Sequence, residues 1–245
     1  MSGGGTGIGA ATARRLAAAG ARVVVMGRRA GPVEEVAAEI GGLACVGDSA
    51  APADAERAVT LAAGELGGLD VLIANAGGDG SAAALDVDDG LWEAVLRSNL
   101  TSSFVLARAA LPALAERSGA IVVVSSVAGL FAIPDDVGYT AAKHALLGLT
   151  RSLARDYGPR GVRVNAICPG GVDTPMLRAG GVRGARSEEE ARARGDRLSA
   201  YNWFMPIKRL STPEEQAAVI AFLASDEASY VNGVALDVNG GLYMA

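Results

Sequence analysis

The sequence predicts an α/β fold, with helices on both faces of a doubly wound, Rossmann-type parallel sheet. Apolar, β-branched runs alternate with helical stretches along the chain, and this order gives parallel strands joined by crossover helices. The runs are apolar throughout rather than at every second position, which indicates strands buried on both faces. The chain of 245 residues suffices for one such core, so we expect a single domain over 1–245.

In the first half of the chain, apolar runs bounded by glycine or charge give the strands. The run 22–27 contains three consecutive valines, which favour a strand. Pro32 suits the first turn of the helix that follows. In order, we expect a helix over 10–19, a strand over 22–27, a helix over 32–40, a strand over 43–46, a helix over 53–66 and a strand over 71–74.

The second half continues the alternation with longer helices. Valine and isoleucine dominate the run 120–124, and valine recurs in 162–167, as expected of buried strands. In order, we expect a helix over 88–114, a strand over 120–124, a helix over 137–157, a strand over 162–167, a helix over 213–223 and a strand over 234–238.

The stretch from Met176 to Met205 breaks this rhythm, because it is charged and contains glycine. A solvated loop is one interpretation. We favour a helical substrate lid, since long insertions in compact domains often cover active sites. The apolar end of the stretch, 201–205, would then face the substrate.

Composition and charge argue against several function classes. The net charge is −5 and no block of lysine and arginine stands out, so nucleic acid is not an expected partner. The apolar runs are too short to span a membrane, and the start lacks a signal-peptide pattern. Cys45 and Cys168 are the only cysteines, which fits a reducing cytoplasm. The only histidine, His144, is interpreted as a helix-surface or packing residue, and no cluster predicts a metal site.

The glycine-rich start, 2–9, has the form of a phosphate-binding loop. Glycines at positions 3, 7 and 9 let the backbone approach a pyrophosphate at the amino end of the next helix. Free N–H groups and the helix dipole favour anions there. Such a run by itself also suits a flexible terminus, but its place before a helix and a strand favours dinucleotide binding.

A series of motifs in consistent order resembles the short-chain dehydrogenase/reductase (SDR) family essentially from end to end. The motifs are Gly3-x-x-x-Gly7-x-Gly9, Asn75-Ala76-Gly77, Asn99 in Ser98-Asn99-Leu100-Thr101, Ser126 in Ser125-Ser126-Val127-Ala128-Gly129, Tyr139-Thr140-Ala141-Ala142-Lys143, the loop from Pro169 to Thr174, and Val238-Asn239-Gly240-Gly241. The resemblance implies that the catalytic residues are Asn99, Ser126, Tyr139 and Lys143. It further implies that Lys143 binds the nicotinamide ribose and that Asn99 holds a water in a proton relay.

The chemistry of this group can also be argued from the residues. Tyr139 and Lys143 are four positions apart on a helix, so they share one face. A buried ammonium beside a phenol favours the phenolate and lowers its pKa from about 10. Tyr139 can then exchange a proton with an alcohol or carbonyl oxygen that Ser126 holds by a hydrogen bond. The alternative is an ordinary amphipathic pair; Ser126, thirteen residues upstream of Tyr139 as in the family, argues against it.

Cofactor choice is expected at the end of the strand 22–27. NAD-binding proteins usually place an acidic residue there to hold the ribose hydroxyls. Here Gly27 is followed by Arg28 and Arg29, and two guanidinium groups suit a 2′-phosphate. We therefore expect NADP(H) to be preferred, with NAD(H) possible; solvated loop charges are the alternative interpretation. Asp48 stands where the family has an Asp near the adenine. The expected cofactor-binding residues are Gly3, Gly5, Thr6, Gly7, Ile8, Arg28, Arg29, Asp48, Ser49, Asn75, Ala76, Gly77, Tyr139, Lys143, Pro169, Gly170, Val172 and Thr174.

The N-terminus departs from the family pattern, in which a central strand comes just before the glycine loop. Only Met1 precedes Ser2 here, so the first strand is expected to be truncated and its neighbours to lack a partner. Our hypothesis is that Met1 is a misassigned start and that the native chain begins upstream.

Three functions remain open on the sequence. The leading interpretation is an oxidoreductase that transfers a hydride between NADP(H) and a carbonyl or secondary alcohol substrate. A 3-oxoacyl-thioester reductase would share every motif. A catalytically silent NADP(H)-binding protein is the alternative from another class. The intact Ser126, Tyr139 and Lys143 argue against it, while the missing first strand argues for it.

The long helices over 88–114 and 137–157 are apolar on more than one side. One side must cover the sheet, and a helix that is apolar beyond that stripe usually contacts a partner. The terminal segment 240–245 is also apolar. Because family members commonly pair these helices and the last strand, we expect a homotetramer with two-fold axes. The alternative is that the lid covers the extra apolar side chains within one subunit.

Overall fold

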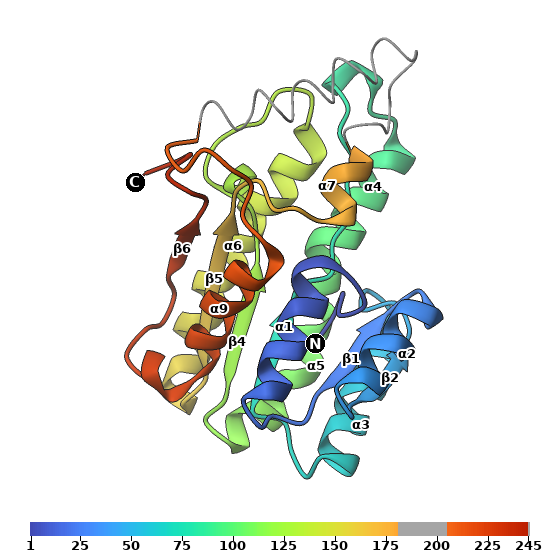
Figure 1. The fold of residues 1–245 in the computed structure, drawn as a ribbon, viewed down its shortest axis with the longest axis vertical. Coiled ribbons are helices and arrows are strands. Elements are labelled where there is room, and N and C mark those ends of the chain that lie inside the picture. Colours follow the sequence, from blue (N-terminus) through green and yellow to red (C-terminus); the bar gives the residue numbers. More distant parts are fainter. Residues whose placement is uncertain (181–204, 245) are drawn as a thin grey trace.

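The computed structural model describes residues 1–180 and 205–244, and strands alternate with helices as expected (Figure 1). The strands are β1 (Val24–Gly27), β2 (Leu43–Val46), β3 (Val71–Ala74), β4 (Ala120–Val124), β5 (Arg163–Pro169) and β6 (Ala235–Val238). The α-helices are α1 (Gly7–Ala18), α2 (Ala30–Glu39), α3 (Pro52–Glu65), α4 (Asp89–Leu96), α5 (Ser102–Glu116), α6 (Val137–Tyr157), α7 (Pro175–Gly180) and α9 (Pro213–Ala224).

All strand pairs are parallel, which confirms the predicted sheet. Strand β1 pairs with β2, and β3, β4, β5 and β6 follow one another in that order. Ser2 connects these two parts, since it forms a parallel bridge with Met26 and its N–H donates to the carbonyl of Ile73 at 3.0 Å. The start of the chain therefore lies between β1 and β3, the two strands whose ends hold the first site residues.

Within the described residues, this central position holds a single bridge instead of a full strand, as the truncated pattern predicted. A cavity of about 300 Å³ opens there, lined by apolar side chains of β1, β3, α1 and α5, among them Val24, Leu72 and Leu106. The ammonium group of Met1 donates to the carbonyl of Val24 at 2.6 Å. Burial lowers the pKa of this ammonium group to about 6, because the charged form loses hydration.

Helices cover both faces of the sheet (Figure 1). On one face, α1 and α2 pack on β1 while α9 packs on β4 and β5; on the other, α3, α5 and α6 pack side by side. Strand residues alternate between the two layers, so Ile121 and Val123 join the cluster under α5 and α6 while Val122 and Val124 join the cluster under α9. This burial on both faces explains why the strands are apolar without interruption.

The expected single helix over 88–114 needs one correction. The structure has α4 and α5 joined by a π-helical turn, Arg97–Thr101. Such turns insert one residue into a helix and frequently mark functional sites. Asn99 lies in this turn and is fully buried. Apolar periodicity cannot reveal the insertion, because one extra residue barely changes the apolar pattern.

The expected lid over 176–205 is described only in part. Helix α7 occupies its beginning and Met205, at its end, is 2 % exposed. Residues 181–204, including the apolar segment 201–204, lie outside the described residues. Across the described helices, none combines the length and apolar character needed to cross a membrane.

Candidate active site

The predicted site residues gather along one edge of the sheet, where the parallel strands end. Arg28 follows β1, Asp48 follows β2, Asn75 follows β3 and Ser126 follows β4. Pro169 is the last residue of β5. In open α/β sheets this edge is where ligands bind, so the topology alone places these residues along one elongated site.

The glycine loop is tightly folded. Gly3 and Gly7 have φ angles of +62° and +55°, which side chains other than glycine rarely adopt. A Cβ at Gly9 would lie 2.0 Å from the carbonyl oxygen of Gly3, so no other residue fits there. The loop thus turns sharply into α1, whose first N–H groups are directed at the site.

Asn75 fixes this loop from the neighbouring strand. Its Nδ2 donates to the carbonyl of Gly3 at 3.1 Å. The N–H groups of Asn75 and Ala76 both donate to Ser2 Oγ, at 3.1 and 3.0 Å. The Asn75-Ala76-Gly77 motif therefore has a structural role here, since it holds the start of the chain beside the end of β3.

The opposite wall is the loop after β5. A Cβ at Gly7 would lie 3.1 Å from Thr174 Cγ2, so the glycine at position 7 keeps the two loops from colliding. Thr174 and Val172 are buried in this wall. A cradle with exposed backbone N–H groups on one side and a close second loop suits an extended phosphate-containing ligand. The residues present therefore fit a dinucleotide.

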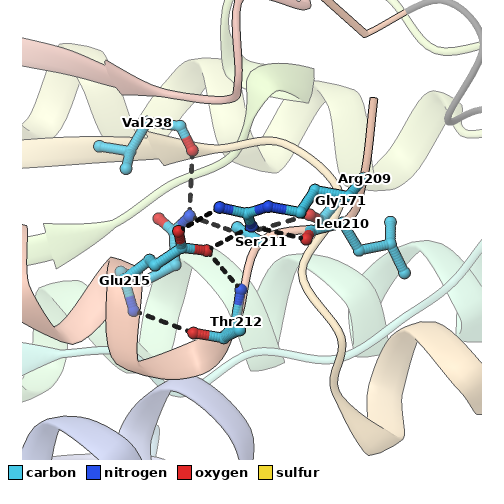
Figure 2. A network of polar contacts seen from close by, with 8 residues as sticks. Gly171, Arg209, Leu210, Ser211, Thr212, Glu215 and Val238 are labelled. Carbon is cyan, nitrogen blue, oxygen red and sulfur yellow. Dashed lines mark hydrogen bonds and ion pairs between the residues drawn. The ribbon is translucent and has the colours of Figure 1, made fainter. Parts of the chain in front are cut away.

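A polar network holds this second loop in place (Figure 2). The N–H of Ser211 donates to the carbonyl of Gly171 at 2.9 Å, and the N–H of Asp173 donates to the carbonyl of Ser211 at 2.9 Å. Arg209 and Glu215 form a two-bond ion pair, at 2.6 and 2.8 Å, beside them. Our sequence reasoning missed this network. Thr212 and Glu215 form a capping box at the start of α9, and their three-residue spacing was the available signal.

The two arginines after β1 lie beside the glycine loop and the end of β2. The Nη2 of Arg29 donates to Thr6 Oγ1 at 3.3 Å, so Arg29 reaches across the glycine loop. Arg28 is close enough to Asp48 to lower its pKa electrostatically. Both positive charges therefore belong to the wall formed by the glycine loop and the ends of β1 and β2.

Asp48 has a partner that the sequence did not reveal. Its carboxylate accepts from Arg97 at 2.8 Å and from the N–H of Ala50 at 2.9 Å. Burial acts to raise the pKa of Asp48, but these hydrogen bonds and the charge of Arg28 outweigh it and lower the pKa. Arg97, from the π-helical turn, thus fixes Asp48 in its charged form.

Lys143 is the most deeply buried cation at this edge. It is 4 % exposed, and its Nζ donates to the carbonyl of Val124 at 3.1 Å. The same Nζ lies 5.3 Å from the centre of the Tyr139 ring. Burial lowers the pKa of Lys143 to about 8. Its ammonium proton is therefore weakly held for a lysine.

Ser126 is positioned by the end of β4. Its Oγ accepts from the N–H of Ala128 at 3.1 Å. Next to it, Ser125 Oγ donates to the carbonyl of Lys143 at 2.9 Å. A Cβ at Gly129 would lie 2.7 Å from that same carbonyl. The segment with Ser126 is thus pressed directly against the turn of α6 that carries Lys143.

Asn99 joins the cluster from the π-helical turn. Its Nδ2 donates to the carbonyls of Gly78 and Val95, each at 3.0 Å. A Cβ at Gly77 would lie 2.8 Å from Asn99 Oδ1 and 3.7 Å from Lys143 Nζ. The structure therefore brings Asn99 and Lys143 together beside Gly77.

Known proteins resemble this chain over nearly its whole length. The family model described as enoyl-(acyl carrier protein) reductase matches residues 3–243. The chain is 40 % identical to 2-(S)-hydroxypropyl-CoM dehydrogenase 3 of Xanthobacter autotrophicus, covering 99 % of this chain and 94 % of that protein. It is 33 % identical to the 3-oxoacyl-[acyl-carrier-protein] reductase FabG of Salmonella typhimurium, covering 100 % and 96 %.

A solved structure agrees with these matches. The crystal structure of levodione reductase superposes with a TM-score of 0.91 at 34 % sequence identity, covering 98 % of this chain and 95 % of that one. The agreement includes the order of strands and helices that places the site residues.

Proposed function

The chain belongs to the short-chain dehydrogenase/reductase family, and we propose that it moves a hydride between NADP(H) and a carbonyl or secondary alcohol, with Tyr139 as acid and base. Oxidoreductase activity on small carbonyl or alcohol substrates with a nicotinamide cofactor follows from family membership. The observation that carries the finer proposal is the buried ammonium of Lys143 beside the Tyr139 ring.

Lys143 prepares Tyr139 for proton transfer. A positive charge 5.3 Å from the ring centre stabilises the phenolate relative to the phenol, and burial of the ammonium strengthens this effect because little water screens it. Tyr139 then donates a proton to a carbonyl oxygen during reduction, or accepts the proton of a hydroxyl during oxidation.

Ser126 and Asn99 support this step. We infer that Ser126 Oγ donates to the reacting oxygen and orients it toward Tyr139, because Oγ already accepts the Ala128 N–H and keeps its own proton for another acceptor. Asn99 has all of its amide donors in use. We propose that Asn99 fixes the π-helical turn and the loop after β3 beside Lys143, and that the relay water implied by the family resemblance is held there through an oxygen acceptor.

The glycine loop, Asn75 and the loop from Pro169 to Thr174 would hold the nicotinamide cofactor, which supplies or accepts the hydride when bound. The positive-φ glycines and the free N–H groups of α1 would receive its phosphates. Arg28 and Arg29 would pair with a 2′-phosphate, and no carboxylate stands at the end of β1 to repel one. These charges support the preference for NADP(H) over NAD(H).

Three further proposals concern domain organisation, assembly and location. A single domain over 1–245 is supported by the bridge of Ser2 between β1 and β3 and by helices that pack across both parts of the sheet, such as α1 on α9 and α3 on α5. A homotetramer is supported by Phe104 on α5 and Met244 near the C-terminus, which leave 41 % and 77 % of their surface exposed. Both cysteines are free and buried, and thiols kept reduced support a cytoplasmic location.

A 3-oxoacyl-thioester reductase is the second candidate, favoured by the likeness to FabG over the full chain. A cofactor titration followed by a substrate screen separates the candidates. The protein is titrated with NADPH by fluorescence, then tested with simple ketones and acetoacetyl-CoA in the presence of NADPH, and with secondary alcohols in the presence of NADP⁺. Turnover of ketones or alcohols supports the main proposal, and turnover restricted to the thioester supports the second. Cofactor binding without any turnover would overturn both in favour of a silent binding protein.

A further inference from the structure

A third polar side chain, that of Asp136, lies at the start of α6, on the face of the helix that carries Tyr139 and Lys143. Asp136 lies immediately before the helix, three residues before Tyr139 and seven before Lys143. Positions related by three and seven residues stack on one side of a helix. Asp136 therefore lies one turn beyond Tyr139, on the side of the tyrosine away from Lys143.

The loop after β3 runs along this same face. It starts at Gly77, which contacts Asn99 and lies near Lys143. Farther on, the positions of Gly80 and Gly138 both lie against the side chain of Val95, where a Cβ would come within 2.1 and 3.5 Å. Residues 77–81 thus extend from the vicinity of Lys143 toward the start of α6.

At that end, two carboxylates share one hydroxyl. Ser81 Oγ donates to Asp79 Oδ1 at 2.8 Å, and a hydrogen bond between Ser81 and Asp136 acts to lower the pKa of Asp136. A hydroxyl has a single proton to donate, so Ser81 cannot satisfy both carboxylates at once. Asp136 is 9 % exposed, and its buried Oδ1 has no hydrogen-bond partner among the described residues.

An unpartnered buried carboxylate oxygen is costly, and no structural role offsets the cost here. The side chain of Asp136 does not cap α6. Burial and the neighbouring charge of Asp79 raise the pKa of Asp136 to about 6, while Ser81 opposes them. No cation contributes to this pKa within the described part of the chain. At neutral pH the group is therefore mostly ionised, and its Oδ1 still has no donor among the described residues.

We propose that Asp136 is a substrate-recognition residue, whose free carboxylate oxygen accepts a hydrogen bond from a hydroxyl or ammonium group on the substrate. This inference rests on the proposed function, because it places the donor on the molecule whose carbonyl reacts at Tyr139. The second carboxylate, Asp79, adds negative charge at the same end of the site. Substrates with a carboxylate or other anionic group near this position are correspondingly disfavoured.

Four methyl ketones test the proposal, because they differ only in the group remote from the carbonyl. They are 4-(dimethylamino)butan-2-one, 4-hydroxybutan-2-one, the apolar 5-methylhexan-2-one and the anionic 4-oxopentanoate. A charge-assisted hydrogen bond favours its partner by about 10- to 100-fold. We expect kcat/KM with NADPH to be highest for the ammonium or hydroxyl ketone, intermediate for the apolar ketone and lowest for the anionic ketone. Which of those two is higher distinguishes the two donor types.

The variant Asp136→Asn should remove the preference for the donor-bearing ketones while leaving kcat/KM for 5-methylhexan-2-one within about threefold. Asp135→Asn is the matched control, since it removes the same charge at an exposed neighbour, and should keep the wild-type order. Equal loss on all four ketones in Asp136→Asn, or a wild-type protein that does not discriminate among them, would overturn the proposal.

A binding measurement separates this proposal from the proposed function. With NADP⁺, a ketone forms a complex that cannot react because both partners are oxidised. Calorimetric titration of each ketone into that complex should show the same preference and the same loss in Asp136→Asn. Preferential binding without turnover would contradict the proposed function and support substrate recognition by Asp136. Turnover with equal binding of all four ketones would support the proposed function and contradict recognition by Asp136.

Discussion

The Nζ of Lys143 lies 5.3 Å from the centre of the Tyr139 ring and donates to the carbonyl at the end of β4. One buried ammonium group thus connects the helix that carries the acid/base candidate to the strand that leads to Ser126. Placing a charge there opposes folding, because burial lowers the pKa of Lys143 to about 8. Function and stability therefore conflict at this residue.

The variant Lys143→Met tests that conflict. Methionine fills a similar volume without a charge, so we expect turnover to be lost while the free energy of unfolding at pH 7 rises by about 1–3 kcal/mol. The folded-state pKa lies below the unfolded value, so the unfolded chain binds more protons between about pH 8 and 10.5. The difference in free energy of unfolding between variant and wild type should be largest below pH 8. It should shrink as the pH rises through that window. Denaturant unfolding at several pH values measures it, and a variant less stable than wild type at pH 7 would contradict the account.

Two glycine-to-alanine variants test the packing of the phosphate loop. A Cβ at Gly9 would lie 2.0 Å from the carbonyl oxygen of Gly3, whereas a Cβ at Gly64 in α3 would meet nothing within 4 Å. We expect Gly9→Ala to destabilise the protein by about 3 kcal/mol or more and to abolish cofactor binding. Gly64→Ala should stabilise it by up to about 1 kcal/mol through helix propensity. Equal thermal shifts in the two variants would show that the close approach in the loop has no consequence.

Cofactor preference is tested at the end of β1. We expect Arg28→Asp to shift kcat/KM from NADP(H) toward NAD(H) by about tenfold or more, because a carboxylate repels the 2′-phosphate and accepts from ribose hydroxyls. Arg155→Asp makes the same charge change on the exposed surface of α6 and should leave the ratio unchanged. An unaltered ratio in Arg28→Asp would identify Arg28 as a surface charge.

The oligomeric state follows from the exposed apolar surface. Light scattering at micromolar concentration should give four times the chain mass of 24.6 kDa. Phe104→Asp, on the exposed side of α5, should reduce this to a smaller assembly without loss of fold by circular dichroism. A stable monomer for the wild type would refute assembly, and a dimer would leave only one of the two expected interfaces.

Much of the fold could be predicted because strands buried on both faces are uniformly apolar. The strands 43–46, 71–74 and 120–124 and the helix 137–157 were predicted with the bounds that the structure has. The π-helical turn was not, because one inserted residue barely changes the apolar pattern. Ser2 was expected only as part of the glycine loop, and its bridge to Met26 depends on tertiary contact.

For the site, spacing along the chain predicted what lies on one element, such as the pair Tyr139 and Lys143. It could not predict contacts between elements. Arg97 beside Asp48 joins the turn after α4 to the end of β2, and Asp79 near Asp136 joins two loops. Single charged residues in polar loops have no pattern that distinguishes them from solvated charges, so only the fold identifies them.

The central claim, that Tyr139 donates and accepts the proton, is tested most directly by Tyr139→Phe. This variant removes one hydroxyl and keeps the ring beside Lys143, and Tyr230→Phe is the control because Tyr230 is fully exposed. Single-turnover reduction of a ketone with bound NADPH is measured together with fluorescence titration of the cofactor. We predict that Tyr139→Phe slows turnover by a factor of about 10²–10⁴ with cofactor affinity nearly intact, while Tyr230→Phe matches wild type. Retention of more than about a tenth of the wild-type rate by Tyr139→Phe would contradict the proposed acid/base role.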